Sequence, residues 1–179
     1  ADYRNIRVFM HQVFEISRRG RADTALFVPD DNYILDYKGR CSLLIYGQTA
    51  EGTVFDQFAT GSFGIEGKEG SYKDAEDGEL SGNAVEHGGV DSVVRFPCSL
   101  SGGSSIQIDY WVIAADSQYS GEKIQAIFKQ DGLNQRLEGT RRHWSEWLAI
   151  GAAKLPASNE QHLAIAKKSL MVIKVHTDK

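Results

Sequence analysis

Cysteine, proline and long apolar runs are all scarce in this sequence of 179 residues, which holds two cysteines and three prolines. Two cysteines are too few for a disulfide framework, and since Cys41 and Cys98 both lie in apolar runs, they are predicted to be buried free thiols. No run approaches the ~18 apolar residues of a membrane-spanning helix. The formal net charge of -4 provides no basic field for polyanions. We therefore expect neither nucleic acid nor a membrane as a partner.

The composition is that of an ordinary globular protein, with 41% hydrophobic and 25% charged residues. The length fits one domain, or one domain with a helical appendage. The first residues lack the basic and apolar regions of a signal peptide, which predicts a cytoplasmic location. The chain begins with Ala1 rather than Met, as a processed chain or a piece of a longer one would.

Apolar residues alternate with polar ones in the first part of the chain, which predicts antiparallel strands. The alternation from Ile6 to Ile16 indicates a long half-buried strand, with Arg7, His11 and Glu15 on its other face. Residues 25–28 and 33–38 form a predicted hairpin, because the intervening Pro-Asp-Asp-Asn is typical of a tight turn. Further strands are expected at 41–46, 54–58, 91–96 and 106–114. One end of the last of these should be covered, because its second face becomes apolar.

The last third of the chain changes to a helical period. Helices are predicted over 122–130, 133–150 and from Ser158 to about Val175, where Ser-Asn-Glu-Gln has the form of a capping box. The last helix should place Leu163, Ala166, Leu170 and Ile173 inward. Trp144 and Trp147 lie at helical spacing, which favours packing over sugar stacking. Strands followed by helices predict a mainly β fold with C-terminal helices.

Between these parts, eight of the eighteen glycines fall within residues 61–89, which we call the glycine-rich segment. It has no strand or helix period and is expected to be an extended loop. It contains no phosphate-binding glycine motif. An EF-hand is excluded because Lys73 and Ala75 stand where oxygen ligands are required. What remains is a loop whose glycines allow close backbone approach, as at a domain interface or the rim of a sugar pocket.

No catalytic group or metal site follows from the remaining motifs. The five histidines lack metal-ligand spacing, and neither cysteine has a neighbouring base. A loose cation site at Asp74, Glu76 and Asp77 stays open as an alternative to a solvated acidic loop. We expect no cofactor and no metal.

The run from Lys73 to Asn83, followed by His87 to Ser92, resembles the bacterial and archaeal glucoamylase-type enzymes of glycoside hydrolase family 15. The Lys-Asp-Ala-Glu-Asp-Gly run is the most specific element. Similar stretches are 9–12, 24–39, 59–61, 144–147 and 169–178, so the resemblance spans nearly the whole chain. Met10 departs from the pattern, because an aromatic residue is usual there.

The resemblance implies a particular domain organisation. Residues 1–117 would be part of a mutarotase-like super-sandwich of antiparallel sheets that lacks its first strands. Residues 118–157 would be linker helices, and residues 158–179 the first helix leading into an α/α toroid. Family members hydrolyse α-glucosidic bonds with inversion, and their two catalytic glutamates would lie in the toroid beyond Lys179. No catalytic residue is therefore carried onto this chain.

The implied partners are an α-glucan oligosaccharide and the chain's own toroid. The glycine-rich segment would pack on the toroid and shape the entrance to its pocket. The interdomain or pocket-rim candidates are Lys73, Asp74, Glu76, Asp77, Asn83 and His87. A sandwich without its first strands would leave edges and an apolar face, which self-association or folded-back helices would cover.

Two other functions stay open. The chain could be a free-standing carbohydrate-binding sandwich, which would bind sugar by itself. It could also be a mutarotase-like epimerase that uses His87 or His11 with a carboxylate, although the sequence identifies no such carboxylate.

Overall fold

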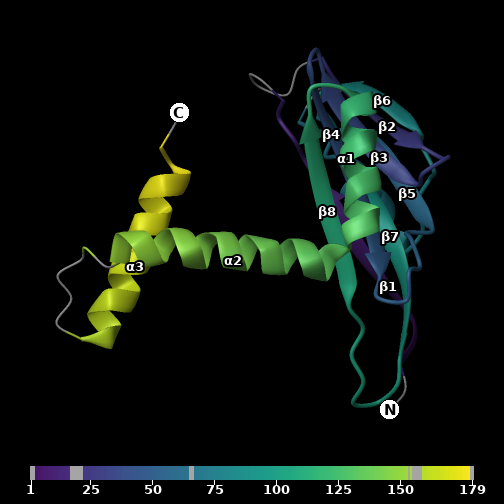
Figure 1. Ribbon diagram of the computed structural model, residues 1–179. Helices are drawn as coiled ribbons and strands as arrows, with labels where there is room; N and C mark the ends of the chain where they lie inside the picture. The colour runs from purple at the N-terminus through teal and green to yellow at the C-terminus, as the bar shows by residue number, and fades with distance from the viewer. Residues whose placement is uncertain (1–2, 17–21, 65–66, 153, 155–158, 178–179) are drawn as a thin grey trace. The chain divides into compact units, whose positions relative to one another are not determined.

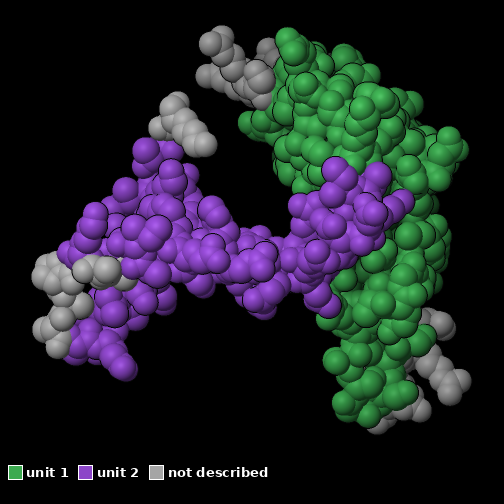
Figure 2. All heavy atoms as spheres, in the orientation of Figure 1, with its two compact units in different colours: residues 1–125 green, residues 126–179 purple. Residues whose placement is uncertain are grey.

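A computed structural model describes residues 3–16, 22–64, 67–152, 154 and 159–177. The chain divides into two compact units, residues 1–125 and 126–179 (Figure 2). The first unit contains all the strands and the beginning of the first long helix. The second contains the rest of that helix and two more. The fold is mainly antiparallel β-sheet followed by helices, as the sequence predicts.

Two antiparallel sheets form the first unit (Figure 1). In the three-stranded sheet the order is β1 (Tyr3–Gln12), β7 (Val90–Leu100) and β5 (Gln57–Ser62). In the five-stranded sheet the order is β6 (Val85–Gly88), β2 (Asp23–Val28), β3 (Tyr33–Lys38), β4 (Cys41–Thr49) and β8 (Ile108–Ala115). The central strand β7 pairs with both of its neighbours in the smaller sheet. The predicted 25–28 and 33–38 hairpin is confirmed by the pairing of β2 with β3.

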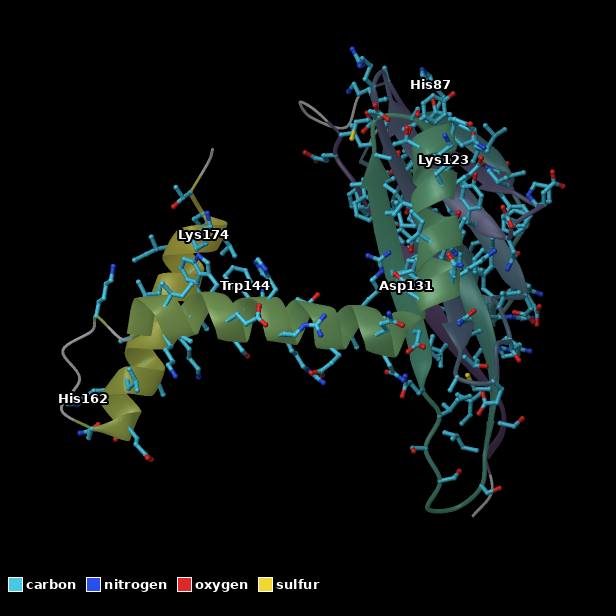
Figure 3. The ribbon with its side chains drawn as sticks, viewed as in Figure 1. His87, Lys123, Asp131, Trp144, His162 and Lys174 are labelled. Carbon is cyan, nitrogen blue, oxygen red and sulfur yellow. The ribbon has the colours of Figure 1, made fainter. Side chains whose placement is uncertain are left out.

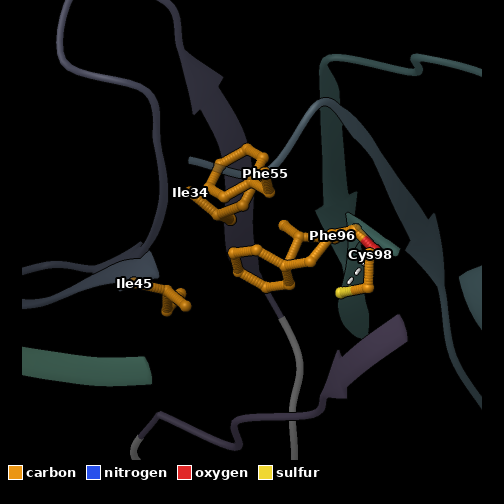
Figure 4. Packing of buried hydrophobic residues seen from close by; sticks show 6 residues of the cluster. Ile34, Ile45, Phe55, Phe96 and Cys98 are labelled. Atoms are coloured by element: carbon orange, nitrogen blue, oxygen red, sulfur yellow. Dashed lines mark hydrogen bonds between the residues drawn. The ribbon is translucent and has the colours of Figure 1, made fainter. Parts of the chain in front are cut away.

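A buried apolar cluster with residues from both sheets forms the main core (Figure 4). Ile34 and Ile45 come from the larger sheet, and Phe96 and Cys98 come from β7. These positions follow the period of two that the sequence shows. Both cysteines are free. Cys98 is buried, which raises the pKa of its thiol, whereas Cys41 is only partly buried, so the prediction of a buried thiol holds in full for Cys98 alone.

Two strands differ in extent from the prediction. Strand β1 ends at Gln12, four residues before the predicted end. The buried Gln12 donates to Ser92 Oγ, and from Val13 onward the chain leaves the sheet, until the Ile16 backbone N–H donates to Asp23. The strand predicted at 54–58 is also displaced, because β5 begins at Gln57 and Val54 makes only an isolated bridge.

The predicted covering of strand β8 is confirmed. Helix α1 (Gln118–Asp131) begins four residues before the predicted start, and its first two turns lie on the outer face of the five-stranded sheet (Figure 1). Trp111 Nε1 donates to Gln125 Oε1 at 3.0 Å, and Tyr33 Oη donates to Glu122. These contacts cover an outer apolar cluster made of Tyr33, Leu35, Leu44, Tyr46 and Ile113. Helix α1 therefore covers this face.

In the second unit, helices α2 (Leu133–Ala152) and α3 (Glu160–Val175) contact one another. The N-cap of α3 is Asn159, whose side chain accepts a hydrogen bond from the His162 backbone N–H, whereas the predicted cap Ser158 lies outside the described residues. The predicted inward residues Leu163, Ala166 and Leu170 are half-buried. Ile173 is 63% exposed, so its predicted inward position is wrong within this unit, because α2 alone cannot cover the far end of α3.

Trp144, labelled in Figure 3, and Trp147 are both half-buried on α2. Their rings contact each other edge to face, with 5.7 Å between centroids. This arrangement favours the packing interpretation of the pair. None of the helices in the described ranges is long and apolar enough to cross a membrane.

Candidate functional site

The glycine-rich segment is more regular than predicted. It contains a 3-10 helix, η1 (Ser71–Asp77), and the edge strand β6, so the prediction of an extended loop is wrong for these residues. Leu80 and Ala75 pack on Phe9, Ala59 and Val93, on the outer face of the three-stranded sheet. The segment is thereby attached to its own sheet by a small apolar core. It is positioned by rigid strands rather than by loops.

Asp91 on β7 is the polar centre of this attachment. Its Oδ2 lies 2.7 Å from His11 Nε2 on β1 and accepts a hydrogen bond of 2.7 Å from the Ser71 backbone N–H. The Asp91 side chain is fully buried, whereas the His11 side chain is 29% exposed. One buried carboxylate thus joins the first strand to the start of η1. Burial without such partners would cost several kcal/mol, so these contacts hold the segment in place.

Two glycines make room for this carboxylate. A Cβ atom on Gly70 would lie 2.4 Å from Asp91 Oδ2, and one on Gly61 would lie 2.8 Å from Asp91 Oδ1. Gly70 also has φ of 116°, which side chains rarely adopt. Both glycines are therefore required by close approach to Asp91, which gives the sequence's glycine enrichment a definite physical cause at these two positions.

Three rings meet beside this centre. The His11 ring lies 5.6 Å from the Tyr72 ring and 6.4 Å from the Phe63 ring, measured between centroids. Phe63 and Tyr72 are each 40% exposed. We call His11, Phe63 and Tyr72 the ring cluster.

The structure places three of the six predicted rim residues around one hollow. Lys73, Asp74 and Asn83 line an open hollow of about 440 Å³, together with residues of β5 such as Thr60. Asp74 accepts a hydrogen bond from the Ser81 backbone N–H, and Asn83 donates to the Thr60 carbonyl at 2.7 Å. Both side chains thus hold the walls of the hollow in place.

The other three residues lie outside the lining of that hollow. Glu76 forms an ion pair with Lys73, and Asp77 accepts from the Glu79 backbone N–H in a local turn. His87 lies on the edge strand β6, where its Nδ1 is 2.9 Å from Thr24 Oγ1 (Figure 3). The prediction that His87 lies in the extended loop of the glycine-rich segment is therefore wrong, because β6 pairs with β2.

The sequence patterns did not identify the carboxylates that are buried in the interior. Asp91 pairs with His11 across 80 positions, a separation that no local pattern reveals. Asp36 and Asp23 are also buried, and Lys38 forms an ion pair with Asp23 at 3.0 Å. Burial, followed by the charge of Asp23, raises the pKa of Asp36 to about 7. A signal was present, since Asp36 shares the inward face of its strand with Ile34.

A charged network closes the other end of the segment. Arg95 on β7 binds both carboxylate oxygens of Asp56 and also contacts Glu79, which forms an ion pair with Arg7 at 2.9 Å. A hydrogen bond from Gln57, with the nearby arginines, lowers the pKa of Glu79. Most of these groups are exposed, so the network fixes the path of the chain more than it stabilises the fold. Within the described ranges, no three His, Cys, Asp or Glu side chains gather as metal ligands would.

No family model matches the sequence, and no curated protein matches it. Among solved structures, the chain is similar to a bacterial glucoamylase in complex with acarbose, with a TM-score of 0.57 and 9% sequence identity. The similarity covers 79% of this chain and 20% of that chain, so it corresponds to about one fifth of the glucoamylase. At this identity the likeness shows the fold alone. The chain has a glucoamylase-like arrangement of a β-sandwich followed by helices.

Proposed function

We propose that this chain is the non-catalytic sandwich and linker region of a glucoamylase-type enzyme of glycoside hydrolase family 15, acting on α-glucans. The observation that carries the proposal is the similarity of 79% of this chain to one fifth of a bacterial glucoamylase. On this proposal the sandwich is of the mutarotase-like type. The catalytic groups belong to a helical domain of the same polypeptide.

The second unit supports this proposal through its exposed apolar side chains. Helix α3 exposes Val172, Ile173 and Val175, each by more than half. An α-helix with a continuous exposed apolar surface is usually covered by further helices. An α/α toroid would supply such helices, and α3 would then be its first. Self-association through the same surface is the competing way to cover it.

The hollow beside the glycine-rich segment supports the role of that segment as a pocket rim. Lys73, Asp74 and Asn83 bring a cation, a carboxylate and an amide to one open surface. Such groups can hydrogen-bond sugar hydroxyls or a neighbouring domain. We propose that this surface faces the catalytic domain and borders the entrance to its pocket.

Comparison of the 179-residue chain with the protein encoded by the whole reading frame tests the proposal. Glucose release from maltotriose should occur only with the whole protein, and the product should initially be the β-anomer, as expected for inversion. Hydrolysis by the 179-residue chain alone would overturn the non-catalytic assignment. Rapid exchange between the anomers of free glucose, catalysed by the 179-residue chain, would instead favour the alternative function of a mutarotase-like epimerase.

The rim assignment has its own test in the whole protein. Asp74→Ala should lower kcat/KM for maltotriose by several-fold, because the Ser81 backbone N–H loses its acceptor and the hollow changes shape. The exposed Asp30, in the β2–β3 turn, provides the matched control Asp30→Ala, which should leave the rate unchanged. Equal rates for both variants and the unchanged protein would contradict the rim role.

A further inference from the structure

The ring cluster is a surface feature that the scaffold function does not require. Phe63 and Tyr72 each expose two fifths of their surface, and the ring of each lies near the ring of a histidine that is itself partly exposed. Exposed aromatic residues that occur singly are ordinary, but rings gathered around a polar side chain are typical of ligand sites.

The imidazole at the centre is held in one orientation. The Asp91 carboxylate can only accept a hydrogen bond, so the 2.7 Å contact requires the proton on His11 Nε2. Nδ1 is then an acceptor in the neutral imidazole and a donor in the imidazolium, and it has no hydrogen-bond partner among the residues that the structure describes. Asp91 is itself fixed by the Ser71 backbone N–H. His11 Nδ1 is therefore positioned before any ligand arrives.

The two aromatic rings are also positioned by the backbone. A Cβ on Gly70 would lie 2.8 Å from Phe63 Cδ2, so the Phe63 ring rests directly against the main chain of residue 70. Tyr72 belongs to η1, one residue after the Ser71 N–H that binds Asp91. The buried carboxylate thus controls both His11 and the helix that carries Tyr72.

We propose that His11, Phe63 and Tyr72 form a binding site for one pyranose ring of a neutral saccharide. The C–H face of a pyranose packs on aromatic rings, and one of its hydroxyls can donate to His11 Nδ1 while the Tyr72 hydroxyl serves a second. The formal net charge of -4 disfavours nucleotides and other polyanions, which also stack on aromatic rings. The site does not depend on the proposed catalytic partner, since all its residues belong to this chain.

Titration of the 179-residue chain with maltotriose, followed by isothermal calorimetry, tests the proposal. Binding with Kd of about 10 mM or tighter is expected for so exposed a site. Phe63→Ala and Tyr72→Ala should each weaken it by about five-fold, the loss of roughly one aromatic contact. Tyr119→Ala removes a ring that is 66% exposed on α1 and should leave Kd unchanged. Circular dichroism melting curves confirm that each variant is folded.

Two outcomes would overturn the proposal. The first is that neither maltotriose nor cellotriose binds. The second is that Phe63→Ala and Tyr72→Ala bind as tightly as the unchanged chain, or that Tyr119→Ala weakens binding equally. If the two ring variants keep full saccharide affinity and also impair activity of the whole protein, the ring cluster is a contact between domains instead of a saccharide site. A whole protein that does not hydrolyse maltotriose would contradict the proposed function, but it would leave the saccharide site untouched.

Discussion

His11 Nε2 and Asp91 Oδ2 lie 2.7 Å apart although the two residues are 80 positions apart in the chain. The contact joins an edge strand to the centre of the three-stranded sheet, and the same oxygen accepts from the Ser71 backbone N–H. One buried carboxylate therefore determines where the glycine-rich segment starts its 3-10 helix. The predictions below begin with this carboxylate.

Replacing Asp91 by alanine should lower the free energy of unfolding of the sandwich by roughly 2–4 kcal/mol, because the buried Ser71 N–H loses its acceptor and a cavity remains. Asp91→Asn keeps one acceptor oxygen and should cost less. Urea denaturation followed by tryptophan fluorescence measures both. If Asp91→Ala unfolds at the same urea concentration as the control Asp30→Ala, the central role of this carboxylate is wrong.

Gly70→Ala should be far more destabilising than Gly82→Ala. Both glycines have positive φ, and Gly70, with φ of 116° and ψ of 171°, also lies in a backbone region that is almost restricted to glycine, so alanine carries the greater strain there. Only at Gly70 would the new methyl group collide with Asp91 and Phe63, since a Cβ at Gly82 meets open space. The difference in melting temperature therefore measures the collision together with the greater backbone strain at Gly70. Equal melting temperatures of the two variants would contradict the close approach of Gly70 to the Asp91 carboxylate.

Asp36→Asn should stabilise the protein increasingly as the pH rises. Burial raises the pKa of Asp36 to about 7, so the folded protein keeps this carboxyl protonated while the unfolded chain, with a pKa near 4, ionises it. The native aspartate has no such effect below about pH 4 and destabilises the fold increasingly as the pH rises. Its full cost, reached above pH 7, is on the order of 4 kcal/mol.

The measurement is the difference in unfolding free energy between Asp36→Asn and the unchanged protein at pH 4.5 and at pH 8. Any fixed cost of the amide cancels in that comparison. The exposed Asp30→Asn serves as the control and should show no such trend. Parallel stability curves for Asp36→Asn and the unchanged protein would mean that this carboxyl is ionised in the folded state.

Trp111→Phe should destabilise the sandwich by roughly 1–2 kcal/mol, because the nearly fully buried Gln125 loses the hydrogen bond from Trp111 Nε1. Adding Gln125→Leu to Trp111→Phe removes the polar group left without that bond and should recover part of the loss. A double-mutant cycle measured by urea denaturation gives the coupling between sheet and helix. Additive effects would contradict the contact between β8 and α1.

Local patterns were sufficient for the sequence to predict the β2–β3 hairpin and the change from strands to helices. Pro29 to Asn32 supplies turn residues, and the period of two places Ile34 inward. The strand ends were less predictable. Strand β1 stops at Gln12, whose side chain donates a hydrogen bond to Ser92 Oγ and accepts one from Tyr110 Oη. Both partners are distant from Gln12 in the sequence. The predicted strand to Ile16 followed apolar alternation that continues after the sheet has ended.

At the candidate site, too, the sequence predicted the features that depend on near neighbours and missed those that depend on distant ones. The sequence drew attention to the glycine-rich segment and to Lys73, Asp74 and Asn83, which do line one hollow. It placed His87 in a loop, because the pairing of β6 with β2 cannot be seen in four residues. It also passed over Asp91, since an aspartate within an apolar strand is recognisable as a buried partner only when His11 is known to be its neighbour.

By itself, the sequence determined the order of the elements, the alternating faces of strands β1 and β8, and the position of a glycine-rich stretch, because these depend on neighbours a few residues apart. Only the tertiary structure decided where that stretch lies, which carboxylates are buried, and which rings meet at the surface. Those features depend on residues brought together across many tens of positions. Burial and hydrogen bonding act between such residues only after the sheets have formed.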